Sequence, residues 1–589
     1  MVQVENEWCS QHADQESLYH QQLIRLLREA GVDVPLNACN QLWQEVDGTI
    51  HTWNASDQLT TNLRQLRAVQ PEAPALVSEY WTGWFDQWGE KHSETVSAEK
   101  HFARMAGVLA AGAQYNLYMF HGGTNFGFTG GRTVGGPDTY MTTSYDYDAP
   151  LLEAGGRGDK YDATKRVSTF ASQFGTLLAH LEPARHPVAV SPDSGPHPLS
   201  VVHLTGARGD VVFLLKSPQD KTKQTTLLLP NGLPLPVPLG DEPAVWLPVD
   251  ARLSNGTTLD YTNLSPLAFV DDRMLVLVGP AGSEGVLSLD GLHIDVKVPG
   301  GKTPTVEIVD GLTLLVLNPP MADASYATPD GWAVGCGGLD AENQPLPRKG
   351  WPTQFRIALD GTVSKTKTQV MRKPTAPKLG AWSAADTAGY LDGSAESYRP
   401  IDGPASFEKL GNDEGYGWVH LGLPKASAAK PKVLSPGSGD RLHFYRDGMF
   451  DQLIGHSVGG NRLAPTTLRV GGKMTALIDN LGRFNFGMQL GEQKGLLAPL
   501  FAVEPVKLPQ PQRAGQPSPD PFAVRGYVQD HRHGDVAAAE GLSWTVKPAG
   551  RRPMILEFDA LPVSAGLKIN GEPTAVWHRH HSGGVPRFV

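Results

Sequence analysis

Two glutamates near the start of the chain stand at the ends of short apolar runs. Glu7 ends the run 2–6, and Glu79 ends the run 75–78. Breaking a glycosidic bond needs one carboxyl group to protonate the leaving oxygen and another to attack or shield the anomeric carbon. Asn6, beside Glu7, could hydrogen-bond a sugar hydroxyl next to that carbon. The pattern predicts paired acids at the mouth of a parallel barrel, although each glutamate taken alone could simply mark the start of a helix.

Strands and helices alternate over residues 1–185, an order that could bring the two acids together. Apolar residues at helical spacing predict one helix that starts near Asp14 and is capped by it, and further helices around Leu63, over 97–112 and over 163–182. Short β-branched runs predict strands at 1–5, 32–37, 49–54, 75–81 and 115–120. A closed parallel barrel of this kind has eight strands. We therefore expect about the last five strand–helix units of a (β/α)8 TIM barrel, with the first three outside this sequence.

Beyond residue 185 the chain changes to short β-type runs. The runs 201–204, 211–215 and 274–278 are rich in Val and Leu and are separated by turn residues. The chain holds 65 Gly and 47 Pro, which favours turn-rich β architecture over helical bundles. Proline-rich stretches at 371–377 and 505–521 indicate breaks between domains. The sequence thus predicts an α/β domain followed by all-β domains.

Composition and charge exclude several classes of function. A net charge of −10 without a basic stripe argues against a nucleic-acid partner, and no apolar stretch is long enough to span a membrane. Three cysteines, Cys9, Cys39 and Cys336, are too few for a disulfide framework. We expect buried thiols, although Cys9 and Cys39 could pair if the fold joined them. The His-rich stretches 531–533 and 578–581 lack acidic or Cys partners at ligand spacing, so we expect no metal site there.

Four longer motifs in the first 151 residues carry a resemblance to a known family. They are Val4–Trp8, Ser78–Trp84, Asn116–Gly127 and Thr143–Leu151, and they closely resemble glycoside hydrolase family 35, the retaining β-galactosidases. The resemblance implies Glu7 as general acid/base and Glu79 as nucleophile, ~5–5.5 Å apart as in a retaining pair, with no metal or cofactor. It also implies that Asn6, Trp84, Tyr118 and Tyr147 contact the terminal galactose.

The resemblance extends to the C-terminal part of the chain. The stretches 440–448 and 479–487 resemble galactose-binding-like jelly-roll domains, which either bind sugar or only knit a sandwich together. The expected division is 1–185 for the C-terminal portion of the TIM barrel, 199–370 for one or more β-sandwich domains, 378–504 for the jelly roll, and 505–589 for a linker and a C-terminal β segment.

The expected function is that of an exo-acting retaining β-galactosidase on a galactoside oligosaccharide or glycoconjugate. An exo-β-glucosaminidase or a transglycosylase on the same scaffold is the alternative within enzymes. The alternative from another class is a truncated, non-catalytic carbohydrate-binding relative, or half of a split enzyme whose barrel a partner chain completes. Because the barrel start lies outside the sequence, we expect little turnover from this chain alone. The resemblance favours an extracellular or periplasmic location.

Overall fold

The structure is a computed structural model that divides into two compact units. Unit 1 comprises Met1–Asp86, His92–Thr124 and Ser144–Leu379, and unit 2 comprises Gln87–Lys91, Asn125–Thr143 and Gly380–Val589. The description covers all residues except 9–12, 41–45, 93–95, 129, 133–139, 180, 195–197, 369–374, 423–431, 436, 456–458, 461–465, 468–472, 486–490, 505, 514–541, 547–553, 555, 558–563, 571, 579–586 and 589.

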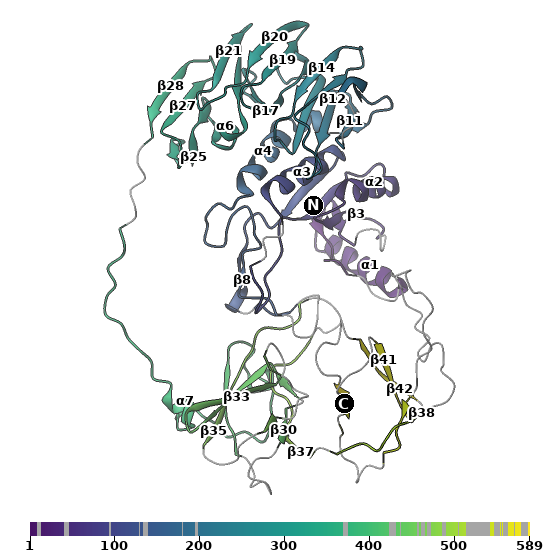
Figure 1. Ribbon diagram of the computed structural model, residues 1–589, viewed down its shortest axis with the longest axis vertical. Helices are drawn as coiled ribbons and strands as arrows, with labels where there is room; N and C mark the ends of the chain where they lie inside the picture. Colours follow the sequence, from purple (N-terminus) through teal and green to yellow (C-terminus); the bar gives the residue numbers. More distant parts are fainter. Residues whose placement is uncertain are drawn as a thin grey trace. The chain divides into compact units, whose positions relative to one another are not determined.

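Unit 1 begins with short parallel strands (Figure 1). They are β1 (Val2–Gln3), β2 (Leu36–Ala38), β3 (Ile50–His51), β4 (Trp53–Ala55), β5 (Leu76–Trp81) and β6 (Gln114–Tyr118). Neighbours pair in parallel in the orders β1-β2-β3 and β4-β5-β6. Only Thr52 separates β3 from β4, and its amide donates to the Ala38 carbonyl at 2.9 Å. The predicted strands are confirmed, in chain order. However, β2 starts later than predicted, because Pro35 has no N–H to donate.

The helices that follow these strands differ in how well they are packed. They are α1 (Ala13–Glu29), α2 (Leu59–Val69), α3 (Ala98–Ala110), α4 (Tyr161–Gln173) and the short α5 (Gly175–Leu178). The predicted cap Asp14 is wrong, because α1 begins at Ala13 and Asp14 lies inside it. On α1, Leu18 is 64% and Leu26 52% exposed, whereas Met105 of α3 and Phe170 of α4 are fully buried. The helix predicted over 163–182 is broken at its middle and ends at Leu178.

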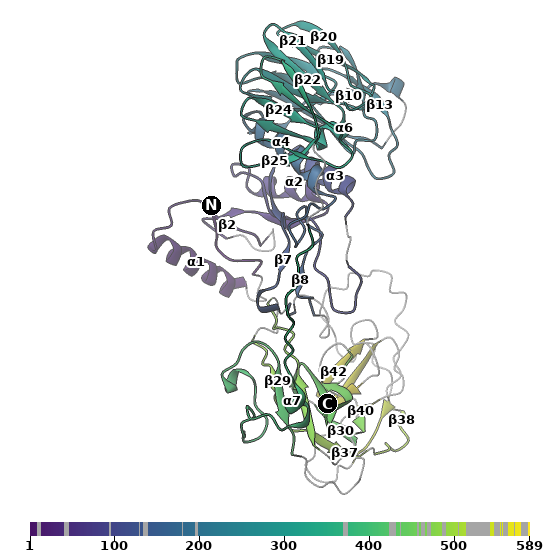
Figure 2. The same cartoon turned by 90° about the vertical axis from the view of Figure 1, so that its left-hand side faces the viewer.

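The β-rich remainder of unit 1 packs against α3 and α4 (Figures 1 and 2). The Trp246 ring stacks on Phe102 of α3 at 5.7 Å and on Phe170 of α4 at 4.8 Å between centroids. One core therefore joins the α/β and β parts. The largest sheet has the order β20 (Leu292–Lys297), β19 (Glu284–Leu289), β16 (Thr258–Thr262), β15 (Ala244–Arg252), β12 (Gly209–Leu215), β11 (Ser200–Gly206) and β9 (Glu182–Pro183).

Three smaller sheets and the two-stranded pair β25 (Cys336–Leu339) and β26 (Pro345–Pro347) complete this part of unit 1 among the described residues. The first sheet has the order β17 (Ser265–Val270), β18 (Met274–Val278), β22 (Leu312–Leu317) and β21 (Thr305–Val309). The second has the order β10 (Ala189–Val190), β13 (Gln224–Leu228) and β14 (Pro234–Pro238). The third has the order β23 (Ser325–Thr328), β24 (Gly331–Val334), β27 (Thr353–Ala358) and β28 (Val363–Lys367). The helix α6 (Pro319–Asp323) follows β22 and is capped by Asn318. The all-β architecture predicted for this region is confirmed.

Unit 2 is also mainly β and has a small core of its own around Phe444. Its two largest sheets in the described residues have the orders β29 (Gly417–His420), β35 (Met474–Ile478), β32 (Arg441–Arg446) and β33 (Met449–Gly455), and β34 (Thr466–Thr467), β30 (Lys432–Leu434) and β37 (Phe501–Val503). Four two-stranded sheets accompany them in the same described residues. Two segments from the first part of the sequence belong to this unit. The Trp88 amide donates to the Tyr140 carbonyl at 2.8 Å, and the Tyr140 hydroxyl and the buried Lys494 ammonium both donate to Asp440.

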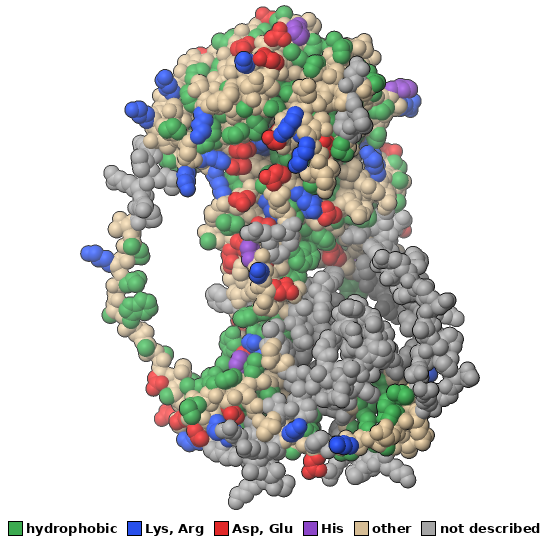
Figure 3. All heavy atoms as spheres, viewed as in Figure 1, with side chains coloured by type: hydrophobic (Ala, Val, Ile, Leu, Met, Phe, Trp, Pro, Cys, Tyr) green, Lys and Arg blue, Asp and Glu red, His purple; other side chains and the backbone are tan. Residues whose placement is uncertain are grey.

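The remaining expectations concern thiols, metals and charge. Cys39 and Cys336 are buried free thiols as predicted, while Cys9, 531–533 and 579–581 lie outside the described residues. Within the described part of the chain, no three His, Cys, Asp or Glu side chains gather as a metal site would require. None of the described helices combines the length and the apolar character of a membrane span. On the face in Figure 3, acidic and basic side chains intermingle over the β-rich part of unit 1.

Candidate active site

Glu79 is fixed by a well-packed strand. On β5, Val77 and Tyr80 are fully buried, and Glu79 between them is partly buried. The pairing of β5 with both neighbours shifts register here, so that Asn54 of β4 stands opposite Glu79. Such bulges are common beside active sites because they redirect a side chain. The indole Nε1 of Trp81 donates to Glu79 Oε2 at 3.0 Å.

The electrostatic setting of Glu79 raises the pKa of its carboxyl group. Burial raises its pKa, the hydrogen bond from Trp81 lowers it, and the nearby charge of Glu7 raises it again, with a net increase. Like charges and loss of water both disfavour ionisation of a carboxyl group. The two predicted acids therefore lie close enough to influence each other's charge.

Glu7 is positioned by polar contacts rather than by a strand. It lies beyond β1 with a φ of 54°, a left-handed conformation that costs a non-glycine residue about 1–3 kcal/mol. Asn54 Nδ2 donates to Glu7 Oε1 at 2.8 Å across 47 residues of sequence. The Ser78 hydroxyl donates to Asn54 Oδ1 at 2.6 Å and contacts the Thr52 hydroxyl at 2.7 Å. Because the Ser78 proton is used on Asn54 Oδ1, the amide of Asn54 must turn its NH2 toward Glu7.

Cys39 lies directly beneath this turn. Its Sγ accepts from the Glu7 amide at 3.3 Å, and its thiol faces the Glu5 carbonyl and Asn6 Oδ1, each at 3.6 Å. Burial raises the pKa of the thiol to about 11, so it stays protonated at neutral pH and can donate. The exposed Asn6 is also held by Gln3, whose Nε2 donates to Asn6 Oδ1 at 3.2 Å. The thiol thus supports both members of the Asn6–Glu7 pair.

A cluster of aromatic rings lies close enough to Glu79 for its charge to act on Tyr145 and Tyr147. The Tyr147 ring meets Tyr118 at 5.4 Å, Tyr145 at 5.2 Å and Trp84 at 6.2 Å between centroids. The hydroxyls of Tyr118 and Tyr145 lie 3.2 Å apart. Burial raises the pKa of Tyr147, and the rings of Tyr145 and Tyr118 and the charges of Glu79 and Glu7 add to the increase. The structure therefore gathers Glu7, Glu79, Trp84, Tyr118 and Tyr147 in one place, with Asn6 joined to them through Cys39.

Four neighbours of these residues were not singled out from sequence. Trp81 and Tyr145 lie inside the motifs, so the motifs themselves were the signal that could have found them. Asn54 ends the predicted strand 49–54, and Glu79 lies near the end of the strand predicted next. This shared position at strand ends could have indicated that Asn54 lies beside the paired acids. Cys39 carried no signal, because its contact with Glu7 depends on two chain segments 32 residues apart.

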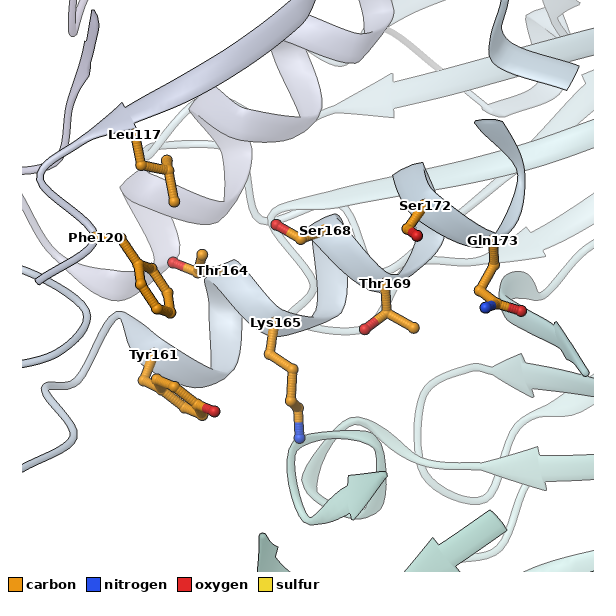
Figure 4. A pocket seen from close by; sticks show the side chains of 9 residues that line it. All are labelled: Leu117, Phe120, Tyr161, Thr164, Lys165, Ser168, Thr169, Ser172 and Gln173. Atoms are coloured by element: carbon orange, nitrogen blue, oxygen red, sulfur yellow. The ribbon is translucent and has the colours of Figure 1, made fainter. Parts of the chain in front are cut away.

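A groove of about 490 Å³ on α4 does not coincide with this site. Figure 4 shows side chains of α4, among them Lys165 and Gln173, together with Leu117 and Phe120. None of the six predicted site residues lines it. Its full lining is Leu117, Phe120, Tyr161, Thr164, Lys165, Ser168, Thr169, Ser172 and Gln173.

Two family comparisons bear on the chain. Residues 1–171 match the family described as glycosyl hydrolases family 35. This segment belongs to that family. Residues 404–506 match the family described as the first all-beta domain of beta-galactosidase. The matched ranges contain the carboxylate-bearing strands and the core of unit 2, respectively.

Curated relatives share only part of their length with the chain. Beta-galactosidase-1-like protein 3 from Homo sapiens is 37% identical over 198 residues, which are 33% of this chain and 30% of that protein. Beta-galactosidase from Macaca fascicularis is 32% identical over 265 residues, or 39% of this chain and 38% of the relative. The Homo sapiens beta-galactosidase is 31% identical over 265 residues, with the same two shares. The chain therefore spans about a third of the length of these family relatives.

Solved structures resemble the chain only weakly. An FMN-binding beta-glucuronidase from Facaelibacterium prausnitzii L2-6 has a TM-score of 0.20 at 11% identity, covering 51% of this chain and 41% of that chain. Bacteroides uniformis beta-glucuronidase 2 has a TM-score of 0.21 at 10% identity, covering 81% and 52%. Scores this low do not establish a shared fold.

Proposed function

We propose that the site is that of an exo-acting retaining β-galactosidase, which hydrolyses terminal non-reducing β-D-galactosyl residues. The observation that carries the proposal is the pair of interacting carboxylates in one family-35 segment, with Glu79 on β5 and Glu7 in the turn that follows β1. Their environments differ, which is what two carboxyl groups need in order to take the separate roles of acid and nucleophile. The names of the relatives supply the galactoside as substrate class.

The mechanism uses each carboxyl group for a different bond. Glu79 attacks the anomeric carbon while Glu7 gives its proton to the leaving oxygen, so that a galactosyl ester forms on Glu79. Glu7, now a carboxylate, takes a proton from water, and the hydroxide oxygen displaces Glu79 and releases galactose. Asn54 donates to Glu7 Oε1, so the transferable proton belongs on Oε2. The partly buried rings of Trp84 and Tyr118 offer stacking surface for the sugar, and the buried ring of Tyr147 packs against both of them.

The same proposal includes the architecture around the site. The parallel order of β1 to β6 supports the last five strand–helix units of a TIM barrel in 1–185. The match of 404–506 supports a galactose-binding-like jelly roll in 378–504. Regions 199–370 and 505–589 then correspond to the β-sandwich and to the linker with its C-terminal β segment.

Kinetics with an aryl β-galactoside test this function. We expect the purified full chain to release the aryl alcohol slowly, because the barrel start lies outside the sequence, and Glu79→Gln should remove whatever activity is measured. For Glu7→Ala, added azide should restore turnover of an activated aryl galactoside and yield β-galactosyl azide, because azide needs no general base. Faster turnover of the matching aryl β-glucosaminide would favour an exo-β-glucosaminidase. Galactosyl transfer to added sugars in preference to water would favour a transglycosylase.

A partner chain that completes the barrel is the second candidate. It is favoured by the outer edges of the parallel strands: among the described residues, β6 pairs only with β5 and β1 only with β2. An open strand edge beside an apolar surface favours association. If the wild-type chain folds but gives no turnover, this candidate or a non-catalytic carbohydrate-binding role is favoured. Galactose binding measured by calorimetry on the same sample would then separate the two.

A further inference from the structure

Lys160 is a buried lysine whose ammonium is fully occupied. Its side chain is only 3% exposed, and it stands just before α4 as the N-cap residue. The ammonium donates to the Thr82 carbonyl at 2.7 Å and to the Asp148 carbonyl at 2.8 Å, and it pairs with the Asp148 carboxylate. An ammonium has three N–H donors, so these three contacts use all of them.

The contacts of Lys160 join two segments of the candidate site. Thr82 directly follows β5 and lies three residues after Glu79, and Asp148 directly follows Tyr147. Tyr147 and Asp148 have φ values of 63° and 49°, in the left-handed region. Non-glycine residues hold such a conformation only where the surroundings fix it. The ammonium of Lys160 contacts this left-handed pair through the carbonyl and the carboxylate of Asp148.

The packing between the two segments is very close. A Cβ on Gly83 would lie 1.8 Å from the Tyr147 carbonyl oxygen, so the backbone of Tyr147 rests on the end of β5 with no room for a side chain between them. Thr82 is itself anchored, since its amide donates to the Tyr118 carbonyl at 3.2 Å and its hydroxyl to the Met119 carbonyl at 2.7 Å. Lys160 thus links Asp148, the residue after Tyr147, to the anchored Thr82.

We infer that Lys160 is a positioning residue, which holds the buried Tyr147 ring close to Glu79 and so keeps water from the carboxylate. The inference rests on the proposed function of Glu79. A lysine that only capped α4 would not need to bind both Thr82 and Asp148. Without the ammonium, the Tyr147–Asp148 backbone can relax from the left-handed region, the ring withdraws, and water reaches Glu79.

The three contacts of the Lys160 ammonium go to Thr82 and Asp148, and none goes to Glu79. The groups whose charge or hydrogen bond interacts with Glu79 are Glu7 from the turn after β1, Trp81 of β5, Cys39 after β2, and Tyr145 and Tyr147. Lys160 is not among the groups that set the pKa of Glu79. A change in that pKa on loss of Lys160 would therefore report a change in hydration.

Lys160→Met is the direct test, since Met keeps the length and removes the donors. Hydrogen exchange by mass spectrometry should be about tenfold faster or more in 144–149 and unchanged in 274–278, because only the former loses its anchor. The acid limb of kcat/KM should move down by about half a pH unit or more, because hydration of Glu79 lowers its pKa. Asp148→Asn, which keeps the carbonyl contact, should show a smaller change of the same sign.

Lys216→Met is the matched control. Its ammonium also donates to a backbone carbonyl, that of Gly240 at 2.7 Å, and burial also lowers its pKa, but it lies in the β-rich part of unit 1. Lys216→Met should change neither the hydrogen exchange of residues 144–149 nor the acid limb of the kcat/KM profile. Equal exchange of 144–149 in Lys160→Met and wild type would overturn the inference, and so would an unmoved acid limb. If the wild type hydrolyses no galactoside, the proposed function fails while the exchange still decides the role of Lys160.

Discussion

The two carboxylate-bearing strand ends of the site are built in different ways. Glu79 sits on a six-residue strand whose neighbours Val77 and Tyr80 are fully buried in the largest core of unit 1. Glu7 follows a two-residue strand, in a left-handed turn held by Asn54 and Cys39. Apolar packing thus positions the proposed nucleophile, and individual hydrogen bonds position the proposed acid/base.

The difference separates what each kind of substitution should do. A core residue behind Glu79 contributes mainly to the free energy of unfolding, which is shared by the whole unit. A polar residue behind Glu7 contributes mainly to the placement of one carboxyl group, and a displacement of about 1 Å can reduce a rate by about 100-fold. Loss of a buried hydrogen bond should therefore lower stability at both ends, whereas activity should fall strongly only at the Glu7 end.

The largest effect is expected at Asn54. Asn54→Leu removes the donor to Glu7 and leaves the Ser78 hydroxyl without its acceptor, at similar side-chain volume. We expect kcat/KM on an aryl β-galactoside to fall about 100-fold. Urea unfolding of the same variant should show a loss of about 1–3 kcal/mol. Unchanged kcat/KM would mean that Asn54 does not place Glu7.

At the Glu79 end the corresponding substitution is Tyr80→Phe. The hydroxyl of Tyr80 contacts His101 Nδ1 at 3.1 Å, and its loss leaves a buried imidazole nitrogen without that partner. We expect the free energy of unfolding to fall by about 1–3 kcal/mol. The kcat/KM per folded molecule should stay within about threefold of wild type. Thermal unfolding and active-site titration measure the two quantities. A large kinetic loss without destabilisation would contradict the contrast between the two ends.

A smaller effect is expected at Cys39. Cys39→Ala keeps the turn in place but removes the thiol that contacts Asn6 and the Glu7 amide. Weak hydrogen bonds of this kind contribute about 0.5–1 kcal/mol, so kcat/KM should fall about two- to fivefold. Cys336→Ala, which alters a buried thiol in the β-rich part of unit 1, is the control and should leave kcat/KM unchanged.

The smallest effect is a shift of the acid limb. Burial holds the pKa of Glu79 above its usual range, and the nucleophile must be ionised, so kcat/KM should fall as pH drops through that raised value. Trp81→Phe removes the donor that stabilises the carboxylate. The acid limb should then move to higher pH, opposite to the shift expected for Lys160→Met. A shift to lower pH would mean that water replaces the indole.

Local patterns predicted the strands and the paired acids, but not what supports them. Glu7 and Glu79 were visible because each ends an apolar run, and the motifs added the aromatic residues. The role of Asn54 depends on the register of β4 against β5, which no local pattern encodes. The same holds for segment 125–143, which lies in the first domain by sequence order but belongs to unit 2. Asp14 failed as a cap because the apolar repeat does not fix a helix start to within one residue.

The most direct test of the two assigned roles is to trap the sugar on the protein. A 2-deoxy-2-fluoro-β-galactoside with a fluoride leaving group slows the second step more than the first, so a retaining enzyme accumulates the glycosyl ester. Peptide mass spectrometry of the treated chain should find the sugar on Glu79, and Glu79→Gln should remain unlabelled. A sugar attached to Glu7, or hydrolysis of the normal substrate with release of the α-anomer as first product, would contradict the account.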